Sequence, residues 1–231
     1  MNAASDESGG VRVPAKSHRL QVCDLGLISY AEALARQQDL VQRRHEDHQT
    51  PNTVLIVEHP PVITLGARAS ENRLLVEPGE LERRGITLVQ VRRGGGTTAH
   101  NPGQIVFYPI LKLKGLRLGV NEYIRSLESI GIALLQSVGV SAERRKGYPG
   151  LWIEGRKIAS IGVQVKRWVT MHGMAINVNN DLSIFEAMVP CGIDGVRMTS
   201  VQNETGRAAD LPALKRRLGE LCMDAWAGGR S

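Results

Sequence analysis

The chain has 231 residues, of which 42% are hydrophobic and only 4% aromatic, so one α/β-type domain of about 200 residues with a mainly aliphatic core fits best. The formal net charge is +6, a mild basic excess that ordinarily serves solubility and can also attract an acidic partner. No basic run is interleaved with aromatic residues, which argues against nucleic acid, and no apolar run approaches the roughly 18 residues of a membrane helix.

The two ends and the cysteines bear on where the chain works. Residues 1–19 lack the apolar segment of a secretory signal and are predicted to form a disordered tail, followed by one domain over 20–226 and a short tail over 227–231. The three cysteines are an odd set without metal-type CxxC spacing. This argues for a reducing compartment, the cytoplasm, and against a disulfide framework.

Apolar periodicity predicts helices and strands in mixed order. The first helix follows a capping box formed by Ser29 and Glu32, and its apolar face includes Tyr30, Leu34 and Val41. Further helices are predicted over 77–84, 120–138 and 210–226. Short apolar runs bounded by turn residues predict strands over 54–58, 62–65, 86–91, 105–111, 151–153, 157–166 and 169–178.

The order of these elements predicts the fold class. Residues 154–156, Glu-Gly-Arg, form a tight hairpin turn between two of the strands. Strands and helices do not alternate in a regular βαβ pattern, and the sequence contains no internal repeat or interdomain linker. We therefore expect an α+β fold with a mixed or mostly antiparallel sheet and helices packed against it.

Residues 92–104, RRGGGTTAHNPGQ, form a loop between two predicted strands. Three consecutive glycines let the backbone approach a ligand closely, and the arginines before them and the histidine after them suit a carbonyl or phosphate group. An ordinary flexible loop would explain the glycines but not the density of Arg, Thr, His and Gln. The Gly-Lys-Ser/Thr ending of a nucleotide-binding P-loop is missing. We favour a binding loop.

Cys191 lies between a proline and a glycine, on a rigid turn rather than a periodic apolar face. Most lone cysteines are small buried hydrophobes, as we expect for Cys23 and Cys222. In this setting Cys191 fits a nucleophile as well as it fits a small buried apolar residue. Lys157 begins a strand of otherwise small and apolar residues. Such a lysine is usually exposed to solvent, so its position alone indicates little.

Five stretches of the sequence together resemble the lipoyl(octanoyl) transferase family. They keep the order and spacing of that family's motifs over roughly residues 22–201. The stretches are 58–66 (EHPPVITLG), 93–104 (RGGGTTAHNPGQ), 157–162 (KIASIG), 172–178 (HGMAINV) and 190–193 (PCGI). The resemblance implies one acyltransferase domain with the fold of biotin and lipoate ligases.

The resemblance also implies the site residues. Cys191 would carry the acyl group as a thioester, and Lys157 would be its activating partner, since a nearby ammonium favours the thiolate. The wall of the acyl pocket would consist of Arg93, Gly94, Gly95, Gly96, Thr97, Thr98, Ala99, His100, Ser160, Ile161, Gly162, Gly173, Met174 and Ala175. The family has tyrosine where this chain has Ala99, so we expect a ring and a hydroxyl to be missing from that wall and longer chains to be tolerated.

The implied reaction takes octanoate from octanoyl-acyl carrier protein and attaches it to a lysine of a lipoyl domain. Acceptors of this kind are the lipoyl domains of 2-oxoacid dehydrogenases and the glycine cleavage H protein. The reaction needs no cofactor and no metal. Backbone N–H groups of the glycine-rich loop, or those near Cys191, are expected to hold the oxyanion.

Three other functions are compatible with parts of the pattern. An ATP-dependent lipoate or biotin ligase shares the fold and a glycine-rich loop, but it activates its acid as an adenylate and needs no cysteine. A cysteine hydrolase would pair Cys191 with His100 or His172. A noncatalytic acyl- or carrier-binding module would be indifferent to loss of the cysteine. We favour the transferase because it accounts for all five stretches.

Overall fold

A computed structural model of the protein describes residues 20–47 and 49–227. The tail predicted over 1–19, and all of the predicted C-terminal tail except Ala227, lie outside the described residues. The helices are α1 (Tyr30–Glu46), α2 (Pro78–Arg83), α3 (Leu113–Leu116), α4 (Val120–Gln136), α5 (Val201–Thr205) and α6 (Leu211–Trp226). Three 3₁₀ turns complete them, η1 (Ala69–Glu71), η2 (Leu182–Ala187) and η3 (Pro190–Gly192).

The strands form two sheets. The larger has seven strands in the order β1 (Leu20–Leu27), β2 (Asn52–Glu58), β6 (Gln104–Ile110), β10 (Val169–Asn177), β9 (Arg156–Lys166), β8 (Tyr148–Ile153) and β7 (Glu143–Arg145). The smaller has three, in the order β4 (Thr87–Gln90), β3 (Val62–Leu65) and β5 (Thr98–His100). The pairs β1–β2 and β3–β4 are parallel and all the others are antiparallel.

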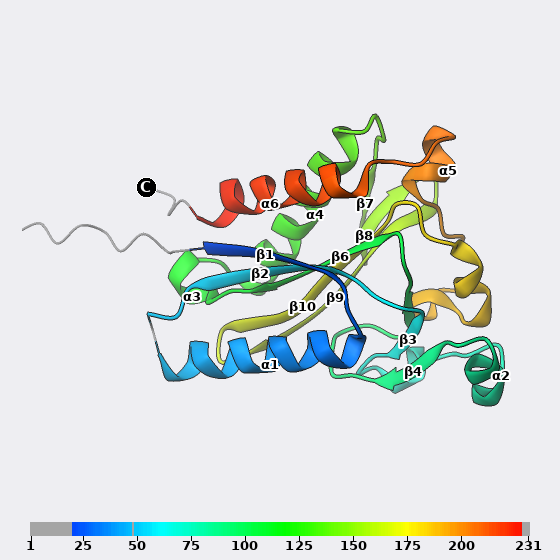
Figure 1. Ribbon diagram of the computed structural model, residues 1–231, viewed down its shortest axis with the longest axis horizontal. Helices are drawn as coiled ribbons and strands as arrows, with labels where there is room; N and C mark the ends of the chain where they lie inside the picture. Colours follow the sequence, from blue (N-terminus) through cyan, green and yellow to red (C-terminus); the bar gives the residue numbers. More distant parts are fainter. Residues whose placement is uncertain (1–19, 48, 228–231) are drawn as a thin grey trace, which may run out of the picture.

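The larger sheet is covered on both faces, which explains its continuous apolar strands. Helices α4 and α6 lie over one face and α1 over the other (Figure 1). Side chains of β2 alternate between the two layers: Val54 and Ile56 pack under α4 and α6, whereas Leu55 and Val57 pack against α1. The smaller sheet lies with α2 at one end of the molecule (Figure 1).

The predicted α+β class with a mixed sheet is confirmed, as are the predicted helix at Ser29 and the hairpin turn. Ser29 Oγ accepts the Glu32 N–H at 3.1 Å, and Glu154 and Gly155 both have positive φ between β8 and β9. Strands β1, β5 and β7 and helices α3 and α5 were not predicted. Val120, the first residue of the helix predicted over 120–138, is 41% exposed. None of the helices that the structure describes is long and apolar enough to cross a membrane.

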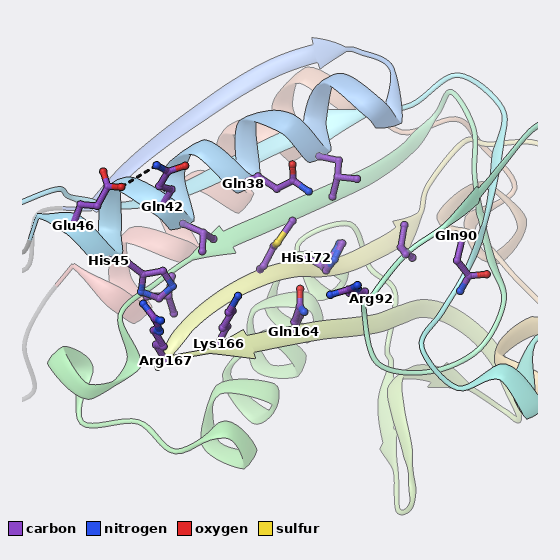
Figure 2. A pocket seen from close by; sticks show the side chains of 15 residues that line it. Gln38, Gln42, His45, Glu46, Gln90, Arg92, Gln164, Lys166, Arg167 and His172 are labelled. Atoms are coloured by element: carbon purple, nitrogen blue, oxygen red, sulfur yellow. Dashed lines mark hydrogen bonds between the residues drawn. The ribbon is translucent and has the colours of Figure 1, made fainter.

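An open groove of about 640 Å³ runs between α1 and the hairpin of β9 and β10 (Figure 2). We call it the α1 groove. Polar side chains along it come from α1, from the end of β4 and from β9. Its apolar lining residues are Leu34, Val41, Val91, Val169 and Met171.

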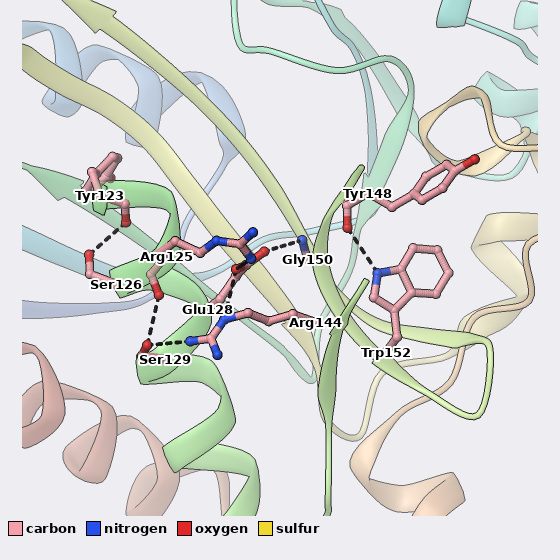
Figure 3. A network of polar contacts seen from close by, with 9 residues as sticks. All are labelled: Tyr123, Arg125, Ser126, Glu128, Ser129, Arg144, Tyr148, Gly150 and Trp152. Atoms are coloured by element: carbon pink, nitrogen blue, oxygen red, sulfur yellow. Dashed lines mark hydrogen bonds and ion pairs between the residues drawn. The ribbon is translucent and has the colours of Figure 1, made fainter. Parts of the chain in front are cut away.

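A buried carboxylate ties the hairpin of β7 and β8 to α4 (Figure 3). The Glu128 side chain is only 3% exposed and pairs with Arg125 of its own helix at 2.8 Å and with Arg144 of β7 at 3.1 Å. Arg144 also donates to Ser129 Oγ at 2.6 Å. This network is the main polar attachment of a strand, Glu-Arg-Arg, whose residues are all exposed.

We expect Glu128→Ala to lower the free energy of unfolding by about 1–3 kcal/mol, because the buried hydrogen bonds to charged groups are lost. The measurement is urea denaturation of both proteins. Glu220→Ala is the matched control, since Glu220 pairs with Arg217 on the same kind of helical surface but is 62% exposed, and its loss should change stability by under about 0.5 kcal/mol. Equal effects of the two substitutions would show that the network does not stabilise the hairpin.

Candidate active site

Cys191 is held by its backbone in an unusual conformation. It lies within the turn η3 with φ +56, and the next residue, Gly192, also has positive φ. The Cys191 N–H donates to the Thr97 carbonyl at 2.8 Å, which joins the turn to the glycine-rich loop. A left-handed residue other than glycine is uncommon and needs support from its surroundings. The turn therefore presents the sulfur in one fixed direction.

Lys157 is buried rather than exposed to solvent. Its side chain is 2% exposed, and its Nζ lies 3.3 Å from Cys191 Sγ and 5.1 Å from the centre of the Trp152 ring. The Lys157 N–H donates to the Arg197 carbonyl at 2.8 Å, and its own carbonyl accepts the Thr199 N–H at 2.9 Å. Among the described residues no carboxylate pairs with this ammonium.

An ammonium in contact with a thiol sulfur favours the ionised form of the sulfur, which is the nucleophile. Removing the ammonium from water costs free energy that a neighbouring anion offsets. Lys157 and Cys191 can therefore stabilise each other as an ion pair. Of the side chains that the structure describes, Lys157 is the hydrogen-bond partner of the Cys191 sulfur. Neither His100 nor His172 makes such a bond.

Cys191 lies between two cavities. The one we call the outer cavity also contains Lys157 and opens between the hairpin of β7 and β8 and the glycine-rich loop. The other, the inner cavity, extends from Cys191 over β9, β10 and β6 toward the start of α1. The inner cavity is lined by Tyr30, Arg93, Gly95, Thr98, His100, Val106, Tyr108, Ser160, Ile161, Gly162, His172, Gly173, Met174, Ala175 and Cys191.

Arg93 organises the glycine-rich loop from within. Its guanidinium donates to the carbonyls of Gly94 and Gly96 at 3.2 and 2.8 Å, and to the backbone and hydroxyl oxygens of Thr64 at 2.9 and 2.6 Å. It is 6% exposed, and burial lowers its pKa from the usual value. A Cβ on Gly162 would lie 2.8 Å from Arg93 Cδ, so glycine is needed where the two meet. The inner cavity therefore contains a fixed cation without a carboxylate partner among the described residues.

Two histidines beside the cavity are neutral. His100 Nδ1 lies 2.7 Å from Gln104 Oε1, which can only accept, so Nδ1 carries the proton. Burial, with a smaller contribution from His59, lowers the pKa of His100 to about 3. His59 Nδ1 likewise donates to the Ile28 carbonyl at 2.9 Å, and its Nε2 accepts from the Tyr108 hydroxyl at 2.7 Å. These rings form a rigid, uncharged wall with Tyr30.

The structure brings most of the predicted site residues together. Besides Cys191, ten of the residues predicted for the acyl pocket line the inner cavity: Arg93, Gly95, Thr98, His100, Ser160, Ile161, Gly162, Gly173, Met174 and Ala175. Gly94 lines the outer cavity instead. Gly96 and Thr97 line neither; a Cβ on Gly96 would lie 2.3 Å from the Glu71 carbonyl oxygen, and Thr97 supports Cys191 through its carbonyl.

Ala99 is placed away from the inner cavity. It is fully buried in a separate apolar cluster with Ile63, Leu81 and Phe185, because successive residues of β5 face opposite sides and its neighbours Thr98 and His100 face the cavity. The expectation that Ala99 forms part of the acyl wall and widens the slot is corrected accordingly.

Four residues of the inner cavity were not predicted for it: Tyr30, Val106, Tyr108 and His172. Tyr30 had been assigned only to a helix face, and His172 only to a possible hydrolase. The alternation of β6 placed Val106 and Tyr108 on one face, but nothing in the sequence indicated which face carries the cavity. Nothing in the sequence indicated that the Trp152 ring would lie against the Lys157 ammonium.

Comparisons with known proteins identify the family and the fold of the chain. The family model described as the lipoyl protein ligase A/B catalytic domain matches residues 29–221. An octanoyltransferase of Bacteroides fragilis (strain YCH46) is 42% identical over 211 residues, covering 87% of this chain and 96% of the relative. One from Syntrophotalea carbinolica is 45% identical over 200 residues, covering 86% and 90%. A crystal structure of lipoate-protein ligase A bound with ATP has the same fold, with a TM-score of 0.71 at 14% identity over 90% of this chain and 85% of that one.

The contact between Lys157 and Cys191 predicts the reactivity of the thiol. Lys157→Ala should slow alkylation of Cys191 by iodoacetamide at neutral pH roughly tenfold, because it removes the positive charge beside the sulfur. A tenfold change corresponds to a loss of about 1.4 kcal/mol of thiolate stabilisation. Lys157→Arg keeps the charge and should recover part of the rate. The measurement is peptide-resolved mass spectrometry, which separates Cys191 from the other cysteines. Lys166→Ala, at the exposed end of the same strand, should label like the wild type. Unchanged labelling in Lys157→Ala would show that the two side chains are not coupled.

The position of Ala99 predicts a stability effect rather than a binding effect. Ala99→Tyr overpacks the cluster around Leu81 and should lower the free energy of unfolding by about 1–3 kcal/mol, without changing the affinity for octanoic acid. Ala175→Leu is the comparison, because Ala175 lines the inner cavity and added bulk there should weaken octanoic acid binding. The measurements are urea denaturation and titration calorimetry. Weaker binding in Ala99→Tyr than in Ala175→Leu would place position 99 in the cavity wall.

Proposed function

The chain belongs to the family of the lipoyl protein ligase A/B catalytic domain, and from this premise we propose that it is an octanoyltransferase that carries the octanoyl group on Cys191. The observation that supports the thioester is the 3.3 Å contact between Lys157 Nζ and Cys191 Sγ, at the boundary between the outer and inner cavities. In this arrangement the aliphatic chain occupies the inner cavity and the donor and acceptor approach Cys191 through the outer one.

The first half-reaction loads the enzyme. The Cys191 thiolate attacks the carbonyl carbon of the donor thioester, the new carbon–sulfur bond forms and the bond to the carrier sulfur breaks. The departing carrier thiolate takes a proton from Lys157 and leaves as a thiol. One thioester replaces another, so the exchange needs no ATP.

The second half-reaction makes the amide. The neutral amine of the acceptor lysine attacks the thioester on Cys191, and Lys157, now uncharged, takes the amine's proton. The carbon–nitrogen bond forms and the carbon–sulfur bond breaks, which restores the ammonium and the thiolate. An amide is more stable than a thioester, and this difference drives the transfer.

Two of the backbone N–H groups expected to hold the oxyanion already have partners, which leaves those of Gly95 and Gly96 as candidates for that role. The N–H of Cys191 already donates to the Thr97 carbonyl, and the N–H of Gly94 donates to the Val163 carbonyl at 2.9 Å. Positive charge is the alternative means of stabilising the tetrahedral anion. Lys157 and the buried guanidinium of Arg93 supply it from the two sides of Cys191.

We propose octanoyl-acyl carrier protein as the donor. As acceptors we propose the lipoyl domains of 2-oxoacid dehydrogenases and the glycine cleavage H protein, and we place the reaction in the cytoplasm, in keeping with free cysteines. Tyr148 lines the outer cavity, and the guanidinium of its neighbour Arg145 lies 4.8 Å from the centre of the Tyr148 ring, so basic and aromatic groups lie beside the opening. Such an opening suits an acidic carrier protein.

The alternatives make different demands on the same residues. An adenylate-forming ligase needs ATP and has no use for an ammonium in contact with a thiol. A cysteine hydrolase needs a base on the sulfur, and His100 is instead bonded to Gln104. A binding module needs neither Cys191 nor turnover.

The test is intact mass spectrometry of the protein mixed with octanoyl-acyl carrier protein, with and without a lipoyl domain, in the absence of ATP. We expect an octanoyl adduct on Cys191 that disappears when the acceptor is added, with octanoyl appearing on the acceptor. Cys191→Ala should give neither product, whereas Cys222→Ala, which alters a fully buried cysteine, should give both. A need for ATP would favour the ligase, release of free octanoate without acceptor the hydrolase, and transfer by Cys191→Ala would rule out the thioester.

A further inference from the structure

One residue lines both the inner cavity and the α1 groove. Among the residues that the structure describes, His172 alone lines both. It is 2% exposed, so its ring fills the space between them rather than projecting into solvent. Figure 2 shows it among the side chains of the groove, between Gln38 of α1 and Gln164 of β9.

The backbone of β10 turns His172 into this position. Met174 pairs with Phe107 of β6, so two residues earlier on β10 His172 lies opposite Pro109, which has no N–H to offer the His172 carbonyl. The His172 N–H donates to Gln37 Oε1 of α1 at 2.8 Å. His172 has φ +59, a left-handed conformation that is uncommon outside glycine and that the Gln37 contact helps to hold.

The ring is suited to contact with hydrocarbon. Its Nδ1 is buried without a hydrogen-bond partner in the described structure, and burial, followed by the charge of Arg93, lowers the pKa of His172 to about 4. The imidazole is therefore uncharged at neutral pH. Behind it the α1 groove has an apolar floor, which includes Leu34 and Met171. A hydrocarbon chain that passed the ring would find apolar surface beyond it.

The distance to the ring matches the proposed acyl group. A Cβ on Gly150 would lie 2.9 Å from Lys157 Cε, and Gly150 pairs with Ser160, so the reactive sulfur lies near the Ser160 end of the cavity. Ser160 pairs with Ala175 and, three positions along, Val163 pairs with His172. Three steps along a strand span about 10 Å, the scale of an extended octanoyl chain.

We propose that His172 is the specificity-determining residue that ends the acyl cavity and sets the chain length the enzyme accepts. The inference rests on the proposed octanoyl transfer and identifies the residue that the far end of the acyl chain would contact. The α1 groove is then a closed-off extension of the acyl site, able to take the end of a longer chain once the imidazole is removed.

The test is His172→Gly, since glycine adopts the left-handed backbone without strain and its lack of a side chain joins the two spaces. The ratio of kcat/KM for dodecanoyl- to octanoyl-acyl carrier protein should rise by roughly tenfold or more, a change equivalent to about 1.4 kcal/mol. The dissociation constants of dodecanoic and octanoic acid, measured by calorimetry, should shift in the same sense. This second readout does not require turnover.

Two further variants complete the design. Arg117→Gly removes another left-handed residue, φ +55, at the exposed end of α3, and should keep the wild-type ratio. His172→Asn retains a residue that tolerates this backbone, has a smaller side chain, and should give an intermediate ratio; it decides the question if the glycine variant does not fold.

Unchanged dodecanoyl-to-octanoyl ratios in folded His172→Gly or His172→Asn, in both transfer and binding, would overturn the role of His172. Failure of the wild type to transfer octanoyl would instead overturn the proposed function. In that case the ratio of fatty acid affinities still decides whether His172 closes the cavity. An equal rise in Arg117→Gly would mean that relief of backbone strain, not loss of the partition, changes the ratio, and would also count against the proposal.

Discussion

The contact between the Lys157 ammonium and the Cys191 sulfur is the interaction on which the rest of the site depends. Each partner is fixed by backbone hydrogen bonds to a remote segment: Lys157 by Arg197 and Thr199, Cys191 by Thr97. The ammonium has no carboxylate partner in the described structure, so its burial is favourable chiefly when the sulfur is ionised. In the proposed mechanism, stability and reactivity are therefore linked in this one contact.

Arg93 is a second buried cation, and it lines the inner cavity. It is buried, and its four hydrogen bonds go to neutral oxygens, so its positive charge is not cancelled locally. Two cations near one sulfur give the site a positive potential that a thiolate and a tetrahedral anion both relieve. The neutral histidines next to them add shape without adding charge. The inner cavity therefore combines one buried cation, Arg93, with the uncharged rings of His100 and His172.

The sequence predicted the elements whose residues are apolar and failed where exposure or context decides. Strands 54–58 and 157–166 are visible as apolar runs, but β7 is Glu-Arg-Arg and wholly exposed, so no pattern marks it. Lys157 and Cys191 were found through motif spacing, whereas the burial of Lys157 depends on Trp152 and on a segment forty residues away, which no local pattern encodes. The direction in which the Ala99 side chain points depends on β5, a three-residue strand within a segment that was predicted to be a loop. The position of His172 depends on its left-handed backbone and on a hydrogen bond to Gln37, which is 135 residues away in the sequence.

The uncharged histidines also tie the whole fold to pH. In the unfolded chain a histidine has a pKa near 6.5, whereas burial lowers the pKa of His100 to about 3 and that of His172 to about 4. At a pH between the pKa of a ring in the folded protein and its pKa in the unfolded chain, the unfolded chain binds more protons than the folded one. Acidification below about pH 6.5 therefore progressively favours unfolding. Each unit of such a difference is worth about 1.4 kcal/mol, and both rings contribute in the same direction. The neutral rings of the cavity wall thus make acidification unfavourable for the folded state.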